Sequence, residues 1–288
     1  MTATCSVLSA RDEPLPGTAA QVTGWVCLEV PGAWGRDVLD GTALGPDLAG
    51  ELDTCAASAG VRIMFIRRPG RSAVAPGRHT VLVAQSHPDR SWCERLEVGR
   101  PDELLDLDFG AVAGKAPGWG ESVTDPVVLV CAHGKRDQCC AVLGRPVASR
   151  LADEFRGAVW ECSHTGGHRF APSMILLPTG FSYGRLSEQQ SVDAVRASMR
   201  GEVYLPGLRG RSCWDAHGQV AEVAVRALTG AGPNDLTVET NSVVTHRDGR
   251  RWIVEMETRE LPARAASCGA APKPVYPVVA TGVREIPT

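Results

Sequence analysis

The sequence predicts an α/β protein made of two similar units and a short C-terminal β extension. Short apolar segments alternate with amphipathic ones, as expected for strand–helix–strand units with parallel strands. The order of these segments between residues 25 and 98 recurs between residues 126 and 185. The offset of about 100 residues is the size of a domain, so it indicates a duplicated domain and not a short structural repeat.

The first unit contains one well-marked helix. Pro46 is expected to open it, because proline suits the first helical position, and Gly60 is expected to end it. Leu48, Leu52 and Cys55 would then lie on one face of this helix. The strands of the unit are expected at residues 25–30, 61–66, 80–85 and 94–98, the last two forming a hairpin.

The second unit repeats this order. Pro146 is expected to open its first helix, with Val147, Leu151 and Phe155 on one face and Gly157 at the end. The other elements are expected as strands at residues 127–130, 158–162, 174–177 and 181–185, and as helices at 187–199 and 215–228. Two strands at 234–239 and 251–257, around a turn at 247–249, form the C-terminal β extension, and the tail after them is not assigned.

A strand–helix–strand unit followed by a hairpin and a helix is the thioredoxin-like order, with a right-handed crossover. We therefore expect tandem thioredoxin-like domains. The boundaries would be residues 1–115 for a degenerate first domain, 116–230 for the second domain, and 231–288 for the β extension and tail. Only the second copy carries a cluster of cysteine and histidine residues.

Composition narrows the class of protein. The chain has 288 residues, 22% of them charged, and a net charge of −3. This charge argues against binding to nucleic acid or to an anionic membrane, which usually needs a basic surface. No secretory signal follows Met1, and no apolar run is long enough to span a bilayer. We expect a soluble, cytoplasmic protein.

The chemistry is concentrated between residues 131 and 168. Cys131 and Cys140 have eight residues between them, and His164 and His168 have three. Each pair follows a predicted strand, and parallel strands of one unit end at the same edge of the sheet, so both pairs should meet there. Two thiolates and two imidazoles can bind a zinc ion or an asymmetric iron–sulfur cluster.

Other uses of these residues remain open at this point. A structural zinc site is possible, although zinc fingers have only about two to four residues between their cysteines. A thiol-redox enzyme is disfavoured because no C-x-x-C motif follows the first strand. A Rieske arrangement, with one Cys and one His from each segment, would leave His168 without a role. There is no dinucleotide fingerprint or P-loop, so we expect no nucleotide cofactor.

The remaining cysteines and polar residues have simpler interpretations. Cys162 should pack inside the sheet, and His133 should be a hydrogen-bonding loop residue. Arg136 and Asp137 are expected to form an ion pair or turn in the same loop. Six cysteines are scattered along the chain: Cys5, Cys27, Cys55, Cys93, Cys213 and Cys268. Most of these six are expected to be small buried hydrophobic residues.

The segments CAHGKRDQCC and SHTGGHRFAPS resemble the signature of the sucrase/ferredoxin-like family, which is related to thioredoxin-like [2Fe–2S] ferredoxins. The resemblance implies a [2Fe–2S] cluster, with Cys131 and Cys140 on one iron and His164 and His168 on the other. The family spacing favours Cys140 over its neighbour Cys139, which is the alternative ligand. The chain shows no paired carboxylates of the glycosidase kind, so we expect no sucrase activity.

The function implied by this resemblance is electron transfer, and we expect a redox module more than a stand-alone enzyme. Two histidine ligands make the cluster less negative than four thiolates do, which raises its potential. Each imidazole also keeps a second nitrogen that can hold a proton, so we expect electron transfer to be coupled to proton uptake. The partners would be redox donor and acceptor proteins, which the sequence does not identify, with neither nucleic acid nor a membrane.

Overall fold

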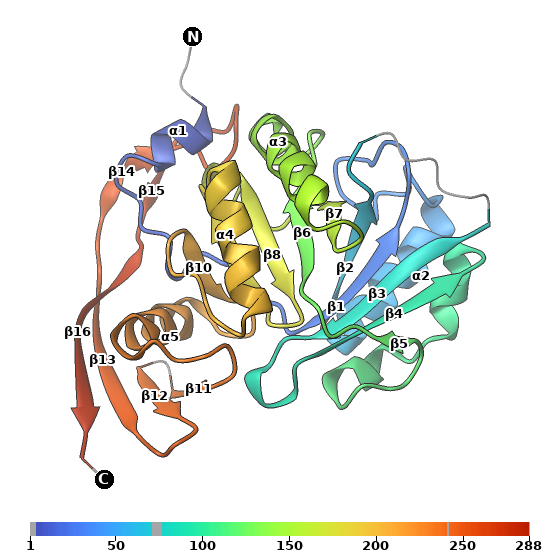
Figure 1. The fold of residues 1–288 in the computed structure, drawn as a ribbon. Coiled ribbons are helices and arrows are strands. Elements are labelled where there is room, and N and C mark those ends of the chain that lie inside the picture. The colour runs from blue at the N-terminus through green and yellow to red at the C-terminus, as the bar shows by residue number, and fades with distance from the viewer. Residues whose placement is uncertain (1–3, 71–76, 241, 288) are drawn as a thin grey trace.

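The computed structural model describes residues 4–70, 77–240 and 242–287, and its centre is one large mixed β-sheet (Figure 1). The strands of this sheet are β1 (Gly24–Glu29), β2 (Val61–Arg67), β3 (His79–Gln85), β4 (Trp92–Val98), β5 (Glu121–Ser122), β6 (Val127–Cys131), β7 (Val159–Cys162), β8 (Ser173–Leu177), β9 (Phe181–Gly184) and β10 (Leu208–Arg211). The ten strands are ordered β10-β9-β8-β6-β7-β2-β1-β3-β4-β5.

The same pairing order occurs in both halves of the sheet. In the first half, β1 is parallel to β2 and antiparallel to β3, which pairs with β4. In the second half, β6 is parallel to β7 and antiparallel to β8, which pairs with β9. The halves are joined edge to edge by β2 and β7, which run antiparallel with Ile66 opposite Cys162 and Arg67 opposite Glu161. The two predicted units therefore share one hydrogen-bonded sheet.

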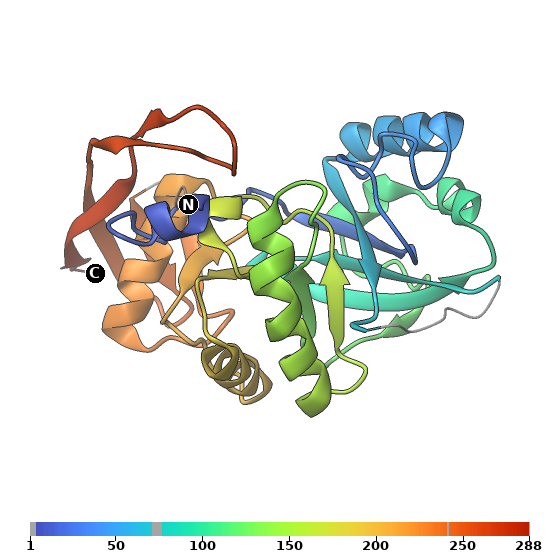
Figure 2. The ribbon, with the colours of Figure 1, turned by 90° about the horizontal axis from the view of Figure 1, so that it is seen from above.

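Helices cover the outer faces of this sheet. The helices are α1 (Cys5–Ser9), α2 (Pro46–Ala59), α3 (Gln138–Glu154), α4 (Glu188–Met199) and α5 (Ala216–Thr229), with short 3-10 turns η1 (Pro88–Arg90), η2 (Pro101–Asp106), η3 (Phe109–Ala113) and η4 (His168–Phe170). Helix α2 packs on the first half through Leu52, and α3 packs on the second half through Leu151. Figure 2 shows α2 and α3 on opposite outer sides, with the strands between them.

The inner faces of the two halves pack against each other because the sheet curls. Trp25 and Leu82 from the first half share one buried cluster with Leu129 and Trp160 from the second. All four side chains have 0% of their surface exposed. Burial of large apolar side chains is the main favourable term in folding, so this cluster fastens the halves together.

The predicted first helix is confirmed. Pro46 stands at the start of α2, and Gly60 takes the left-handed conformation, with φ of 63°, that ends it. The assignment of its buried face was partly wrong, because Cys55 is exposed. The face toward the sheet is formed by Ala49, Leu52 and Ala56, which follow the helical spacing of three and four residues.

The prediction that Pro146 opens the second helix was wrong. Helix α3 begins at Gln138, because the Asp137 side chain accepts a hydrogen bond of 2.8 Å from the backbone N–H of Cys139. Pro146 lies inside the helix on an exposed side. Proline has no N–H, so one backbone carbonyl of the preceding turn lacks its helical hydrogen bond, and at this exposed position water can donate to it instead. Cys139 and Cys140 therefore lie in the first helical turn and not in a loop.

The C-terminal extension forms a second sheet beside α5. Its strands are β11 (Leu236–Thr240), β12 (Val243–His246), β13 (Arg251–Thr258) and β16 (Val278–Ile286), in the order β11-β12-β13-β16, and a separate pair joins β14 (Leu261–Arg264) to β15 (Lys273–Val275). The sequence predicted β11 and β13, and it missed β10, β12 and β16. No helix in the described ranges is both long and apolar enough to cross a membrane.

The first residues of the chain run along the second half of the sheet. The Gly17 N–H donates to the Arg209 carbonyl at 2.9 Å, and the Val22 N–H donates to the Ser212 carbonyl at 2.7 Å. Glu13, almost fully buried, forms an ion pair of 2.8 Å with Arg169. The N-terminal segment thus lies close to the loop that follows β7.

Candidate metal centre

The structure brings Cys131, Cys140, His164 and His168 together at one end of the second half. Cys131 is the last residue of β6 and lies beside Cys162 of β7 in the parallel register. His164 follows β7, His168 begins η4, and Cys140 lies in the first turn of α3.

The four side chains form a ring of contacts. The Cys140 Sγ lies 3.6 Å from the His168 Nδ1. The rings of His168 and His164 are stacked, with centroids 4.0 Å apart and an interplanar angle of 20°. Cys131 closes the ring through hydrogen bonds that involve Cys140 and His164. The cysteines are buried, with exposed fractions of 0% and 1%, whereas the histidines are partly exposed.

The charge states in this ring suit metal binding. The hydrogen bond from the Cys140 thiol lowers the pKa of Cys131, and the same contact raises the pKa of Cys140. The pair therefore holds one thiolate readily. Burial, followed by the nearby His164, lowers the pKa of His168 to about 4. His168 is thus neutral at pH 7, which is the form of imidazole that binds a metal.

The histidine loop has the sharp turn that its glycines allow. Gly166 and Gly167 have φ angles of 89° and 73°, a region that residues with a Cβ rarely adopt. A Cβ on Gly167 would also lie 2.6 Å from the Phe170 ring and 2.7 Å from Arg209 Nη2. Arg209 donates to the Gly166 carbonyl at 3.1 Å, and this hydrogen bond holds the histidine loop in place.

Two arginines place positive charge next to the cysteine pair. Arg209 is fully buried, and burial lowers its pKa to about 9. Arg62 donates to the His164 carbonyl at 2.5 Å, and its charge interacts favourably with Cys162 and Cys131. Among the described residues, neither arginine forms an ion pair with a carboxylate. A buried cation needs a compensating negative charge, and a centre with thiolate ligands supplies one.

The neighbouring loop residues have clear structural roles. His133 is buried, and its Nε2 lies 2.7 Å from the Gly35 carbonyl, as expected for a hydrogen-bonding loop residue. Of the two alternatives predicted for Arg136 and Asp137, an ion pair or a turn, the structure shows the turn: the backbone N–H groups of both residues donate to the His133 carbonyl. Arg136 forms an ion pair with Asp37, which lies in the equivalent loop of the first half, while Asp137 caps α3.

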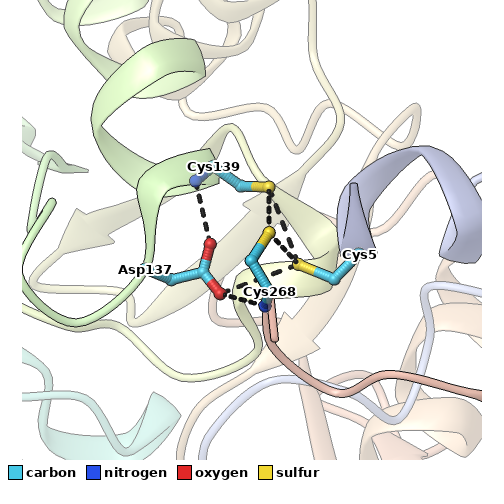
Figure 3. Close-up of side chains that lie close together, drawn as sticks. All are labelled: Cys5, Asp137, Cys139 and Cys268. Carbon is cyan, nitrogen blue, oxygen red and sulfur yellow. Dashed lines mark hydrogen bonds between the residues drawn. The ribbon is translucent and has the colours of Figure 1, made fainter. Parts of the chain in front are cut away.

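Cys139 does not face the ring. Its sulfur lies 3.6 Å from that of Cys5 and 3.3 Å from that of Cys268, beside the carboxylate of Asp137 (Figure 3). The ligand atoms of these four residues all lie within 4.8 Å of one another, so the group could hold a metal ion. Cys5 and Cys268 are thus exceptions to the expectation that most of the scattered cysteines only pack as small hydrophobic residues. No spacing motif indicates this group, because its three segments are more than 100 residues apart in the sequence.

Comparison with known proteins identifies related sequences. The model of the family described as sucrase/ferredoxin-like matches residues 15–210. This stretch includes the four residues of the ring and both arginines, but not Cys5 or Cys268. Altered inheritance of mitochondria protein 32 from the yeast Meyerozyma guilliermondii is 29% identical over 96 residues, which are 30% of this chain and 34% of that protein. The chain thus spans about a third of that protein's length, and no solved structure matches.

Proposed function

The chain belongs to the sucrase/ferredoxin-like family, and on that premise we propose that it is an iron–sulfur electron-transfer protein. Cys131 and Cys140 would hold one iron of a [2Fe–2S] cluster, and His164 and His168 the other. The observation that carries this proposal is the ring of two buried thiols and two partly exposed imidazoles. When bound, such a cluster supplies one-electron transfer.

The spread of the donor atoms favours two metal ions over one. Among the described residues, Cys5, Asp137, Cys139 and Cys268 form a group whose ligand atoms all lie within 4.8 Å of one another. Within the part of the chain that the structure describes, none of the four residues of the ring belongs to such a group. A single zinc ion needs its four donors around one point, whereas a [2Fe–2S] cluster takes one pair of donors at each iron. The proposed division also keeps the contacting cysteines together and the stacked histidines together.

The surroundings support a centre that accepts an electron. Two histidines in place of two thiolates leave the cluster less negative, so the added electron is less disfavoured. Arg62 and Arg209 lie beside the cysteines without carboxylate partners among the described residues. Because Arg209 is fully buried and Arg62 half-buried, their positive charge stabilises the added electron more than that of a fully exposed arginine would.

The histidine side supplies the route for a proton. His168 presents Nδ1 to Cys140, so its Nε2 is the nitrogen available to hold a proton. Both imidazoles are partly exposed, and the glycines between them carry no side chain that would cover the rings. We therefore propose proton-coupled electron transfer, with unidentified redox proteins as donor and acceptor and a cytoplasmic location. The two halves, with the same strand pairing, would be tandem thioredoxin-like domains.

The test is the cofactor content of anaerobically purified full-length protein. The protein should be coloured and contain about two irons and two sulfides per chain. Cys140→Ser should lose this iron, whereas Cys55→Ser, which changes an exposed thiol on α2, should keep it. Colourless wild-type protein with no iron or sulfide would contradict the proposal.

A further inference from the structure

A second group of thiols lies on the other side of the first turn of α3, outside the proposed cluster. Cys5 comes from α1, Cys139 from α3, and Cys268 from the loop between β14 and β15. Figure 3 shows the three sulfurs turned toward one another, with the carboxylate of Asp137 beside them. The segments meet in space although they come from both ends and the middle of the chain.

The distances are those of donors around one ion. The sulfurs are 3.6 Å apart for Cys5 and Cys139, 3.3 Å for Cys139 and Cys268, and 3.6 Å for Cys5 and Cys268. A disulfide needs about 2.05 Å, while two thiolates on one tetrahedral zinc, each about 2.3 Å from the metal, are about 3.8 Å apart. The Asp137 Oδ2 lies 3.8 Å from the Cys5 sulfur and completes a four-atom set.

The carboxylate is held in place and lacks a cation. Its Oδ1 accepts from the Cys139 N–H at 2.8 Å, and its Oδ2 accepts from the Cys268 N–H at 2.7 Å. Asp137 is only 5% exposed. Among the described residues no lysine or arginine forms an ion pair with it, since the adjacent Arg136 pairs with Asp37. A buried carboxylate normally has a charge partner, and here the space beside it is lined by thiols.

The surroundings of Cys139 also favour the anionic form of its thiol, which is the form that binds metal. Ser6 Oγ donates to the Cys139 sulfur at 3.4 Å. Cys139 itself lies in the first turn of a helix of 17 residues, where the helix dipole favours negative charge. Hydrogen bonds from outer residues to ligand atoms are typical of metal sites.

We propose that Cys5, Cys139 and Cys268 bind one structural zinc ion, with Asp137 as the fourth ligand. Thiolate-rich tetrahedral sets are typical of structural zinc. The ion fastens α1 and the β14–β15 loop to the start of α3. Helix α1 in turn packs on η4, which carries His168. The zinc site thus holds α1 and the β14–β15 loop next to the element that carries His168. It uses Cys5 and Cys268, which lie outside the family match.

The experiment measures zinc and iron per chain in the purified full-length protein, using mass spectrometry of the elements. Wild-type protein should carry about one zinc per chain. Cys268→Ser should lose the zinc and keep its iron, whereas Cys140→Ser should lose the iron and keep the zinc. Cys55→Ser, a change to an exposed thiol, should keep both metals.

A milder variant covers the case in which Cys268→Ser does not fold. Ser6→Ala removes only the hydroxyl that donates to Cys139, and it should lower the zinc affinity by about tenfold in a chelator competition. An unchanged affinity in this variant, or zinc retained by Cys268→Ser, would overturn the proposal. So would wild-type protein without zinc, whether its three thiols are all free or two of them form a disulfide.

The outcomes separate this proposal from the electron-transfer function. Zinc that depends on Cys268, in a protein without iron, would support the zinc site and contradict the proposed cluster. Iron that depends on Cys140, in a protein without zinc, would do the reverse.

Discussion

Replacing Gly144 by alanine tests how tightly α3 packs beside the proposed cluster. Gly144 is buried in α3, and a Cβ at this position would lie 2.0 Å from the carbonyl oxygen of Cys131. Contacts between carbon and a carbonyl oxygen are about 3.3 Å or longer, so α3 would have to move away from β6 by about 1.3 Å. The helix that carries Cys140 would then shift relative to the strand that carries Cys131.

The expected magnitude follows from two opposing effects. Alanine is a better helix former than glycine by about 1 kcal/mol. Forcing an extra methyl group into a packed core costs about 1–3 kcal/mol, and a clash with backbone belongs at the upper end. We expect Gly144→Ala to lower the free energy of unfolding by about 2 kcal/mol. Gly50→Ala is the matched control, because a Cβ on this exposed residue of α2 meets nothing within 4 Å.

Urea denaturation of both variants and the wild type measures the effect, and iron content is measured on the same samples. The control should gain up to about 1 kcal/mol and keep its iron. Gly144→Ala should lose stability and part of its iron. If Gly144→Ala were as stable as Gly50→Ala and kept all its iron, the close contact between α3 and β6 would be refuted.

Three further predictions concern the ring. Cys140→Ser should abolish the cluster spectrum while Cys139→Ser largely keeps it, and the opposite result in visible absorption would make Cys139 the ligand. The midpoint potential should fall with rising pH by up to about 59 mV per unit for one proton per electron. Replacing His164 or His168 by Cys should lower the potential and flatten this slope; a potential independent of pH in the wild type would rule out proton coupling. In metal-free protein, the depressed pKa of His168, about 4, means that the fold favours the neutral ring. The neutral His168 ring therefore makes its full contribution to the free energy of unfolding above about pH 6.5, and this contribution is lost as the pH falls toward 4. Denaturation curves measured across this pH range should show a fall in the free energy of unfolding for the wild type that is absent from His168→Gln.

Local signals in the sequence predicted much of the fold. Pro46 and Gly60 mark the ends of α2 correctly, because both act through the backbone of their own helix. The same rule failed at Pro146, because the cap formed by Asp137 starts α3 earlier and an exposed proline is tolerated within the helix. Strands such as β16 were missed because their pairing partners are far away in the sequence.

In the candidate centre too, positions decided by neighbouring strands were predicted, whereas contacts between distant segments were not. The spacing of Cys131, Cys140, His164 and His168 predicted a meeting point, because two neighbouring parallel strands decide where these residues lie. No spacing rule could bring Cys5 and Cys268 to Cys139, since these contacts depend on how α1 and the β14–β15 loop pack on the second half. The positions of Arg62 and Arg209 beside the centre likewise follow from packing between segments.

The antiparallel pairing of β2 with β7 has a consequence for any attempt to isolate the second half. Cutting the chain between the halves would leave β7 as an open edge strand, with unpaired N–H and C=O groups. It would also expose the inner side chains, such as Trp160 and Leu129, that now contact the first half. An excised fragment of residues 116–230 should therefore self-associate, and the intact chain should unfold in one cooperative transition. The first half of the sheet thus covers an edge strand and an apolar face that would otherwise make the second half prone to association.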